Sequence, residues 1–469
     1  MSTASDVTEV DFAVVGSGPA GQKAAISAAK EGRSVVVVER EARSGGACVR
    51  NGTIPSKTLR ETALALRSLE RRTGGVLRAE VREDLEVASL MTRLDEVVGA
   101  HQRYIGEQLR RNDVALWHGN ARFLDARVLE ITAPNGGRRL LRAKHVVLAT
   151  GSRPRTPDGV LVDHDRVLDS DSVLSMTYLP RSLIVLGAGV VASEYASIFA
   201  SLGVTVTMVD RGARPMSFLD AELTDAFLKS FTAAGSRFLP ERRVTSARYD
   251  GVAHCEVLLE DGETLVADTV LCAMGRLANV DHLGLAEIGV KTTARGLVEV
   301  DEHGVTSVPA IYAVGDIVGP PALASTAMEQ GRRAVRHALG LVADRSAASA
   351  IPFCAYTIPE IASVGLTETE AIAKHGAAVV GRARYAEIAR AHVSAYGEGL
   401  IKLIASADGR RLLGVQVVGE SASELVHVGQ MALLAGFDVD VFIEATFNFP
   451  TLAEGYRVAA LDVVRQRRH

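Results

Sequence analysis

Two segments of the chain repeat one pattern of apolar and small residues. The first begins with the mostly apolar segment 10–15, passes through Gly16, Gly18 and Gly21 into an alanine-rich stretch, and ends with the segment 34–39, whose four valines precede Glu39. Short apolar runs bounded by glycine predict buried strands, and the alanine-rich stretch between them predicts a helix. This segment is therefore predicted to fold as a strand, a tight turn, a helix and a second strand.

The same order of elements returns in the middle of the chain. The apolar run 182–186 precedes Gly187 and Gly189, a helical stretch follows, and the apolar run 205–209 completes the second copy. Ala192 stands where the first copy has its third glycine. That position serves mainly the packing of the helix against the strand, so alanine is compatible with the pattern.

An acidic residue follows at the same distance from the first glycine in both copies, Glu39 in one and Asp210 in the other. In a dinucleotide-binding fold the glycine turn brings backbone amides and a helix N-terminus to the pyrophosphate, and the acid meets a ribose hydroxyl. One such glycine pattern alone is also typical of a flexible loop. Two copies with matched acids predict two dinucleotide-binding domains.

The second copy leaves the choice of nucleotide open. Asp210 would accept a hydrogen bond from a free 2′-hydroxyl and so favours NAD, whereas Arg211 and Arg214 could meet a 2′-phosphate and favour NADP. The alternative is that both arginines are solvated loop residues. A site that serves both nucleotides would need such a mixture.

Composition and charge exclude several other classes of protein. The 469 residues are 47% hydrophobic and 23% charged, which is ordinary for a globular chain with more than one core. A net charge of -4 and a pI near 6.3 give no electrostatic footprint for nucleic acid, which the short basic tail 465–468 does not change. No signal peptide is expected in 1–10, and no apolar run approaches the length of a membrane-spanning helix.

The cysteines are few and far apart. They stand at Cys48, Cys255, Cys272 and Cys354, with no spacing typical of a metal site, and none is predicted. We therefore expect a reduced, cytoplasmic chain without a bound metal.

Five motifs together resemble a known family. They are the first glycine turn, the loop 45–57, the segment 149–151, the second glycine turn and the segment 311–316. In this combination the chain resembles the flavoproteins with two dinucleotide folds that include lipoamide dehydrogenase and glutathione reductase. Within them it most resembles the soluble, flavin-containing pyridine nucleotide transhydrogenases, which share the segments 52–57, 168–171, 356–360, 446–451 and 456–461.

The resemblance implies an α/β fold with two Rossmann-like domains and a C-terminal α+β dimerisation domain. The implied division is an FAD-binding domain in two parts, 1–152 and 282–346, an NAD(P)-binding domain at 153–281, and a dimerisation domain at 351–469 after a linker at 341–350. The C-terminal apolar runs 399–404 and 412–418 and a helix near 423–434 predict an antiparallel sheet with helices on one side. Helices are expected between residues 56 and 108.

By the same resemblance FAD is the cofactor and NAD or NADP is the substrate. The cofactor-binding residues implied for the flavin are Gly16, Gly18, Gly21, Glu39, Thr150, Gly151, Asp316 and Ala324, the last at a helix N-terminus aimed at the flavin. Those implied for the nicotinamide nucleotide are Gly187, Gly189, Asp210, Arg211, Arg214 and Gly275. Lys57 is expected to pair with Glu194 beside the flavin N5, where a fixed charge would favour hydride transfer.

Two substitutions separate the chain from the disulfide reductases that it resembles. Cys48 would face Thr53 where those enzymes have a second cysteine, and a hydroxyl cannot form a disulfide. Phe449 stands in the place of their histidine base, with Glu454 retained, so this position cannot move a proton. Both changes argue against disulfide reduction.

The sequence therefore predicts a homodimeric flavoenzyme in which Lys57, Glu194, Thr53 and Phe449 line the reaction site, the last at the partner's flavin. Its expected activity is ping-pong hydride transfer between NAD(P)H and NAD(P)⁺. An NAD(P)H:quinone reductase remains the enzymatic alternative, and a non-catalytic flavin-binding redox sensor is the alternative of another class.

Overall fold

The computed structural model describes residues 7–72, 87–341 and 350–467, which form two compact units. The first unit contains 7–58, 91–155 and 275–341, and the second contains 59–72, 87–90, 156–274 and 350–467. Most of the predicted linker 341–350 lies outside the described residues, as do positions 1–6 of the N-terminal segment and Arg468 of the basic tail.

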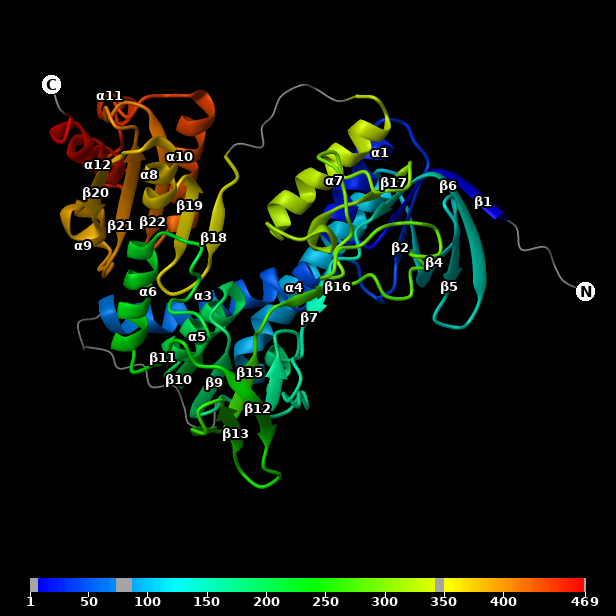
Figure 1. Ribbon diagram of the computed structural model, residues 1–469, viewed down its shortest axis with the longest axis horizontal. Helices are drawn as coiled ribbons and strands as arrows, with labels where there is room; N and C mark the ends of the chain where they lie inside the picture. Colours follow the sequence, from blue (N-terminus) through cyan, green and yellow to red (C-terminus); the bar gives the residue numbers. More distant parts are fainter. Residues whose placement is uncertain (1–6, 73–86, 342–349, 468–469) are drawn as a thin grey trace, which may run out of the picture. The chain divides into compact units, whose positions relative to one another are not determined.

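The first unit is built on a mixed sheet in the order β3-β2-β1-β6-β5-β4, with β17 also paired to β6 (Figure 1). Its central strands β3, β2, β1, β6 and β17 run parallel, whereas β4 and β5 form an antiparallel edge. The strands are β1 Val7–Val15, β2 Val35–Glu39, β3 Ala115–His118, β4 Asn120–Asp125, β5 Val128–Thr132, β6 Arg138–Leu148 and β17 Ile311–Ala313, and a separate pair is formed by β7 Ser152–Pro154 and β16 Arg276–Ala278. The unit's helical segments are α1 Pro19–Lys30, α2 Gly46–Arg50, η2 Gly315–Val318 and α7 Ala324–Ala338, with parts of α3 Thr53–Arg72 and α4 Val87–Arg111.

Small residues let α1 and α7 approach each other closely on one face of this sheet (Figure 1). Ala20, Ala24 and Ala28 of α1 are buried, and a Cβ added to Gly331 of α7 would lie 2.2 Å from Ala20 O. The alanine-rich stretch that predicts α1 therefore also explains why a second helix can pack on it.

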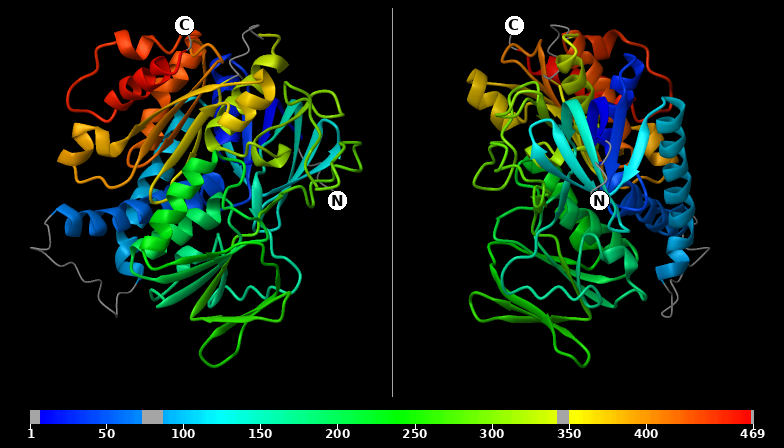
Figure 2. Two further views of the ribbon diagram at one scale, coloured as in Figure 1. Left: turned by 60° about the vertical axis from the view of Figure 1, so that its left-hand side comes forward. Right: turned by 90° about the vertical axis from the view of Figure 1, so that its right-hand side faces the viewer.

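The second unit contains a fully parallel sheet in the order β11-β10-β9-β15-β8. Its strands are β8 Val167–Asp169, β9 Ser182–Leu186, β10 Thr205–Val209, β11 Arg237–Leu239 and β15 Thr269–Cys272, and its helices are α5 Val190–Ser201 and α6 Ala221–Ala233, with the 3-10 turn η1 Val173–Ser175. An antiparallel meander of β12 Val244–Tyr249, β13 Cys255–Leu259 and β14 Thr264–Ala267 belongs to the same unit and ends in a hairpin, drawn in green in Figure 2. The predicted strands and helix of the second copy are confirmed.

The C-terminal part of this unit is an antiparallel sheet, as predicted, and its strands lie in the order β18-β19-β22-β21-β20. Its strands are β18 Phe353–Ala355, β19 Ile361–Gly365, β20 Val379–Arg384, β21 Leu400–Ala405 and β22 Leu412–Val418. Its helical segments are α8 Glu368–His375, η4 Tyr385–Glu387, α9 Ala389–Val393, α10 Ala422–Ala435, α11 Val441–Glu444 and α12 Glu454–Arg465.

The prediction of helices on one side of this sheet is wrong. α10 and α12 cover one face, but Ala371 of α8 packs with Val380, Ile404 and Leu413 on the other, and α6 also contacts β22. The physical reason lies in the strands, because every residue of β22 is buried and both faces must therefore be covered. With this correction the predicted α/β class, with two Rossmann-like folds and an α+β part, is confirmed. Within the described residues, no helix is both long and apolar enough to cross a membrane.

Candidate functional site

The first glycine turn joins β1 to α1 and is held very tightly. Gly16 has φ +104°, and a Cβ there would lie 2.3 Å from Ala149 O; a Cβ on Gly21 would lie 1.9 Å from Gly16 O. Gly18 is different, because the nearest described atom to its added Cβ would be Gly46 Cα at 3.9 Å. Two of the predicted glycines thus serve the protein's own packing, and Gly18 leaves room for a ligand to approach the backbone.

Glu39 ends β2 beside this turn and is 5% exposed. Its Oε2 accepts hydrogen bonds from Ser17 N at 2.9 Å and Ser17 Oγ at 2.6 Å, and Ser17 Oγ also accepts one from Gly45 N at 3.0 Å. Ser17, which sequence reasoning missed, therefore connects the acid to the loop that carries Cys48. The only sequence signal for this role of Ser17 was its position between Gly16 and Gly18 of the glycine turn.

The second glycine turn, between β9 and α5, repeats this geometry. Gly187 has φ +105°, and a Cβ there would lie 2.7 Å from Ala273 O, whereas one on Gly189 would meet no described atom within 4 Å. Asp210 Oδ2 accepts from Ala188 N at 2.9 Å, just as Glu39 accepts from Ser17 N. The structure thus places the acid of each copy against its own glycine turn.

The helices that follow the two turns begin in the same way. α1 and α5 have Gly18 and Gly189 as N-caps, with no described side chain capping either helix and no acidic residue in the first turn. An uncapped N-terminus directs backbone N–H groups and the positive end of the helix dipole outward, which suits a pyrophosphate. Both helix starts therefore fit a dinucleotide.

Thr150, Gly151 and Gly275 lie where the chain leaves the first unit's sheet and later returns to it. Thr150 Oγ1 donates to Asn279 O at 2.7 Å, and Asn279 Nδ2 donates to Thr150 O at 2.9 Å. Gly275 O accepts from Arg155 N at 3.0 Å. These hydrogen bonds join the segment that leaves the sheet to the segment that returns to it. Sequence reasoning missed Asn279 because its partner, Thr150, is far away in the sequence. Their contacts with a cofactor stay a prediction.

Asp316 lies in η2, directly after β17, and is half-buried. Its Oδ2 accepts from Ser152 Oγ at 2.6 Å, and that hydroxyl accepts from Arg276 Nε at 2.8 Å. Ala324 begins α7, whose N-cap Leu323 provides no side-chain hydrogen bond. The first unit therefore contains, next to the sheet that carries the first glycine turn, the carboxylate of Asp316 and the uncapped N-terminus of α7.

The loop with Cys48 brings three predicted residues together. Burial raises the pKa of the Cys48 thiol, while a hydrogen bond with Thr53 and the charge of Lys57 partly offset this, and the carboxylate of Asp316 adds to it. Lys57 Nζ donates to Ser56 Oγ at 3.3 Å. Cys48 therefore faces a hydroxyl, and none of the four cysteines, all of which lie within the described residues, forms a disulfide.

Glu194 lies on α5 and is 5% exposed. Its Oε1 accepts from Tyr356 N at 2.8 Å, and on the next turn of α5 Ser197 Oγ accepts from Ile358 N at 3.1 Å. The acid thus holds the segment 356–360, a contact that the sequence did not predict. Lys57 belongs to the other unit, so its pairing with Glu194 stays a prediction.

The remaining predicted residues lie in the second unit. Arg211 is exposed, whereas Arg214 donates to Ala221 O and Thr224 Oγ1 and pairs with Asp225, so it is held against α6. Phe449 is 75% exposed in the single chain. Within the described residues, no three His, Cys, Asp or Glu side chains gather as metal ligands.

The model of the pyridine nucleotide-disulphide oxidoreductase family matches residues 10–331, and that of the family's dimerisation domain matches 351–460. The chain belongs to this family. Soluble pyridine nucleotide transhydrogenase from Mycobacterium bovis BCG Pasteur is 41% identical over 463 residues, with 98% of each chain covered. The protein of that name from Pseudomonas putida W619 is 39% identical, covering 97% of this chain and 98% of that one. Among solved structures, LpdA from Mycobacterium tuberculosis superimposes with a TM-score of 0.89 at 28% identity, over 97% of this chain and 99% of that one.

Membership of this family makes FAD the cofactor and the nicotinamide nucleotides the substrates. The residues present fit both groups. Gly18 and Gly189 are the fingerprint glycines beside which a Cβ would find open space, and each stands at an uncapped helix N-terminus next to an ordered carboxylate. Each of the two units therefore has a glycine turn whose geometry fits a dinucleotide.

Proposed function

We propose that the protein transfers hydride between NAD(P)H and NAD(P)⁺ through FAD, without a redox disulfide. Relatives at 39 and 41% identity over nearly their whole length carry the name soluble pyridine nucleotide transhydrogenase. The observation that carries the disulfide-free part is the hydrogen bond of Cys48 with Thr53, which puts a hydroxyl where a resolving thiol would be needed. We also propose that the protein acts in the cytoplasm and binds neither nucleic acid nor membrane.

When bound, FAD supplies the reversible acceptance and release of hydride. The chain's own residues supply binding and position. Gly18 and Gly189 admit two pyrophosphates, Glu39 and Asp210 receive ribose hydroxyls, and Lys57 places a positive charge beside the Cys48 loop. With one nicotinamide cradle in the second unit, the two nucleotides would bind in turn.

The proposal is tested by the rate at which the reduced enzyme is reoxidised in stopped flow. NADP⁺ and NAD⁺ should reoxidise it faster than any member of a quinone series. A quinone that is the faster oxidant would instead establish the acceptor-reductase alternative. An enzyme that no nicotinamide nucleotide reduces at all would point to the non-catalytic redox sensor.

Thr53→Cys should create the disulfide that the natural chain lacks. The wild-type enzyme, when reduced by two electrons, should show no long-wavelength thiolate-to-flavin absorption, because without a second thiol both electrons stay on the flavin and no oxidised flavin remains to accept charge from a thiolate. Thiol titration of the denatured variant should reveal two fewer free thiols after oxidation. Cys48→Ser, as control, should keep nucleotide oxidation within about twofold of wild type. An absorption band in the wild type that disappears on alkylation would contradict the proposal.

Arg211 and Arg214 are proposed to favour NADPH over NADH. Replacing both with alanine should raise KM for NADPH by about tenfold and leave KM for NADH nearly unchanged, since only NADPH carries the 2′-phosphate. Steady-state kinetics with both nucleotides measures the ratio of KM for NADPH to KM for NADH. Equal effects on the two KM values would show that the arginines are solvated bystanders.

The family's dimerisation domain supports a homodimer. Phe449, 75% exposed in the single chain, is proposed to enter the partner's site, where an aromatic ring would exclude water. Sedimentation should give a dimer, and Phe449→Leu should slow turnover only about twofold to fivefold because an apolar side chain is kept. Phe449→His should not produce lipoamide reduction, because Thr53 still prevents the dithiol step. A fully active monomer would refute this placement.

A further inference from the structure

The loop between β10 and α6, residues 211–220, carries both arginines that are proposed to choose the nucleotide. Its first part is tied to the second glycine turn, because Met216 N donates to Ala188 O at 2.8 Å. Asp210, just before the loop, accepts from Ala188 N and from Gly212 N at 2.6 Å. The near end of the loop is therefore fixed by the nucleotide turn itself.

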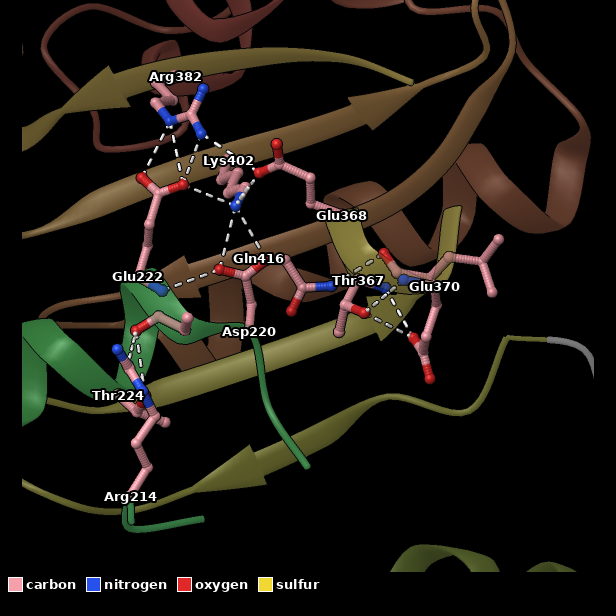
Figure 3. A network of polar contacts seen from close by, with 12 residues as sticks. Arg214, Asp220, Glu222, Thr224, Thr367, Glu368, Glu370, Arg382, Lys402 and Gln416 are labelled. Carbon is pink, nitrogen blue, oxygen red and sulfur yellow. Dashed lines mark hydrogen bonds and ion pairs between the residues drawn. The ribbon is translucent and has the colours of Figure 1, made fainter. Parts of the chain in front are cut away.

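The far end of the loop is fixed by a buried ion pair. Asp220 is 6% exposed and is the N-cap of α6, where its Oδ1 accepts from Glu222 N at 3.0 Å. The same carboxylate accepts from Lys402 Nζ at 3.0 and 2.9 Å. Lys402 stands in β21 with a side chain that is 2% exposed, and its ammonium points at α6 (Figure 3).

Lys402 belongs to a larger network in which every charge has a partner. Its Nζ lies 2.7 Å from both Glu222 Oε1 and Glu368 Oε2, and Arg382 Nε donates to Glu222 Oε2 at 2.9 Å (Figure 3). Burial disfavours the ammonium, yet the hydrogen bonds that it donates to these carboxylates raise the pKa of Lys402 above its ordinary value. Arg382 holds the pKa of Glu222 at about 2, against the opposing effect of burial. Lys402 and Glu222 therefore both remain charged at neutral pH.

A buried ion pair is a poor source of stability, because apolar residues of similar volume would serve the sheet as well or better. What this one provides is a defined position for the start of α6. Arg214 is held by that start, since its Nη1 donates to Ala221 O at 3.2 Å and to Thr224 Oγ1 at 3.3 Å. A continuous set of contacts thus leads from Lys402 through Asp220 and the first turn of α6 to Arg214.

We propose that Lys402 and Asp220 are positioning residues for the choice between NADPH and NADH. By fixing the start of α6, they hold Arg214 where a 2′-phosphate can meet it. This inference rests on the proposed function of the loop. Asp210 keeps its own bonds to the glycine turn, so the binding of NADH does not depend on the ion pair.

The test is Asp220→Asn, which retains a side-chain oxygen for the N-cap and removes the charge that Lys402 holds. Calorimetry with adenosine 2′,5′-bisphosphate and with AMP measures the 2′-phosphate contribution without any hydride transfer. The variant should lose about tenfold in affinity for the bisphosphate and less than about twofold for AMP, because small displacements of a positioning group have large effects. KM for NADPH should rise in parallel while KM for NADH stays the same.

Two further variants separate this role from general stabilisation. Lys229→Ala removes an exposed ion pair between α6 and Glu398, far along the helix from the loop, and should leave the affinity ratio unchanged. Glu368→Gln weakens the hold on Lys402 from a partly exposed position, so it should shift the ratio in the same direction even if Asp220→Asn does not fold. The inference would be overturned if Asp220→Asn lost equal affinity for the bisphosphate and for AMP. It would also be overturned if the ratio of these two affinities were unchanged in folded Asp220→Asn or Glu368→Gln.

The double variant Arg211→Ala, Arg214→Ala serves as the reference for a loop that has lost both arginines. If it lowers the bisphosphate affinity and Asp220→Asn does not, the loop selects the nucleotide but the ion pair does not position it. If neither changes the ratio, the proposed selectivity of the loop fails and the inference falls with it. Flavin-mediated hydride transfer would stand in both cases, because stopped-flow reoxidation tests it separately.

Discussion

Gly189→Ala should give a folded, yellow enzyme that binds NADPH and NADH about 10²-fold more weakly than the wild type. The added methyl group would meet no described protein atom within 4 Å, and the backbone at φ -74° suits alanine. The open space beside Gly189 lies at the uncapped start of α5, where we propose that the nucleotide's pyrophosphate comes close to the backbone. The loss should therefore fall on the substrate and not on the fold.

Gly18→Ala should have the opposite outcome. Its Cβ would meet the nearest described atom, Gly46 Cα, only at 3.9 Å, so the chain should again fold, but the methyl group would stand at the pyrophosphate of FAD. We expect a colourless protein with a normal circular dichroism spectrum. Flavin content by absorbance and nucleotide affinity by calorimetry distinguish the two variants.

The effect of Gly189→Ala on nucleotide affinity should reach about 10²-fold, because a methyl group displaces the whole nucleotide by about 1 Å. Gly106→Ala in α4 is the matched control, since it also meets no described atom within 4 Å but lies far from both turns in the sequence. It should bind both ligands normally. A Gly189→Ala enzyme that binds NADPH normally would show that the second turn is not the nucleotide cradle.

The repeated glycine pattern was sufficient to predict both turns because its requirements are local. φ angles of +104° and +105° at Gly16 and Gly187 and the approach of a neighbouring carbonyl leave no space for a side chain, so the sequence has to show glycine there. The strands β9 and β22 were predicted with their true bounds for a similar reason, since continuous apolar runs between polar ends mark buried strands.

Contacts between distant segments were not predictable in this way. Lys402 interrupts an otherwise apolar strand, and the sequence alone does not say that Asp220, in another part of the chain, is its partner. The side chains of Asn279 and Ser17 contact Thr150 O and Gly45 N, which are backbone groups that residues of any type present, so the sequence does not single out these partners. For the same reason the sequence did not predict that α8 and α6 pack on the second face of the C-terminal sheet, since these contacts also join distant segments.

Arg60→Met should release the segment 356–360, in which Tyr356 N donates a hydrogen bond to Glu194. Arg60 is 2% exposed on α3, its Nε donates to Thr357 O at 3.2 Å, and its Nη2 lies 3.0 Å from Glu360 Oε1, placed as an ion pair without a well-aligned hydrogen bond. Methionine would remove the cation beside the 5% exposed carboxylate of Glu360, whose Oε2 would keep its hydrogen bonds from Ser423 N and Oγ. Removing one member of a buried pair typically costs about 3–5 kcal/mol.

That cost should appear locally, because Thr357 and Glu360 of the segment are the direct partners of Arg60. Hydrogen exchange at the amides of Tyr356 and Ile358, which donate to Glu194 and Ser197, should become about 10²-fold faster. Arg122→Met, which removes an ion pair between two half-exposed side chains of the other unit, should change exchange by less than about threefold at its own site. Adding Glu360→Gln to Arg60→Met should restore part of the protection, since the uncompensated charge is then gone. Unchanged exchange in Arg60→Met would mean that the backbone contacts alone hold the segment against Glu194, and that the ion pair is not what orders it.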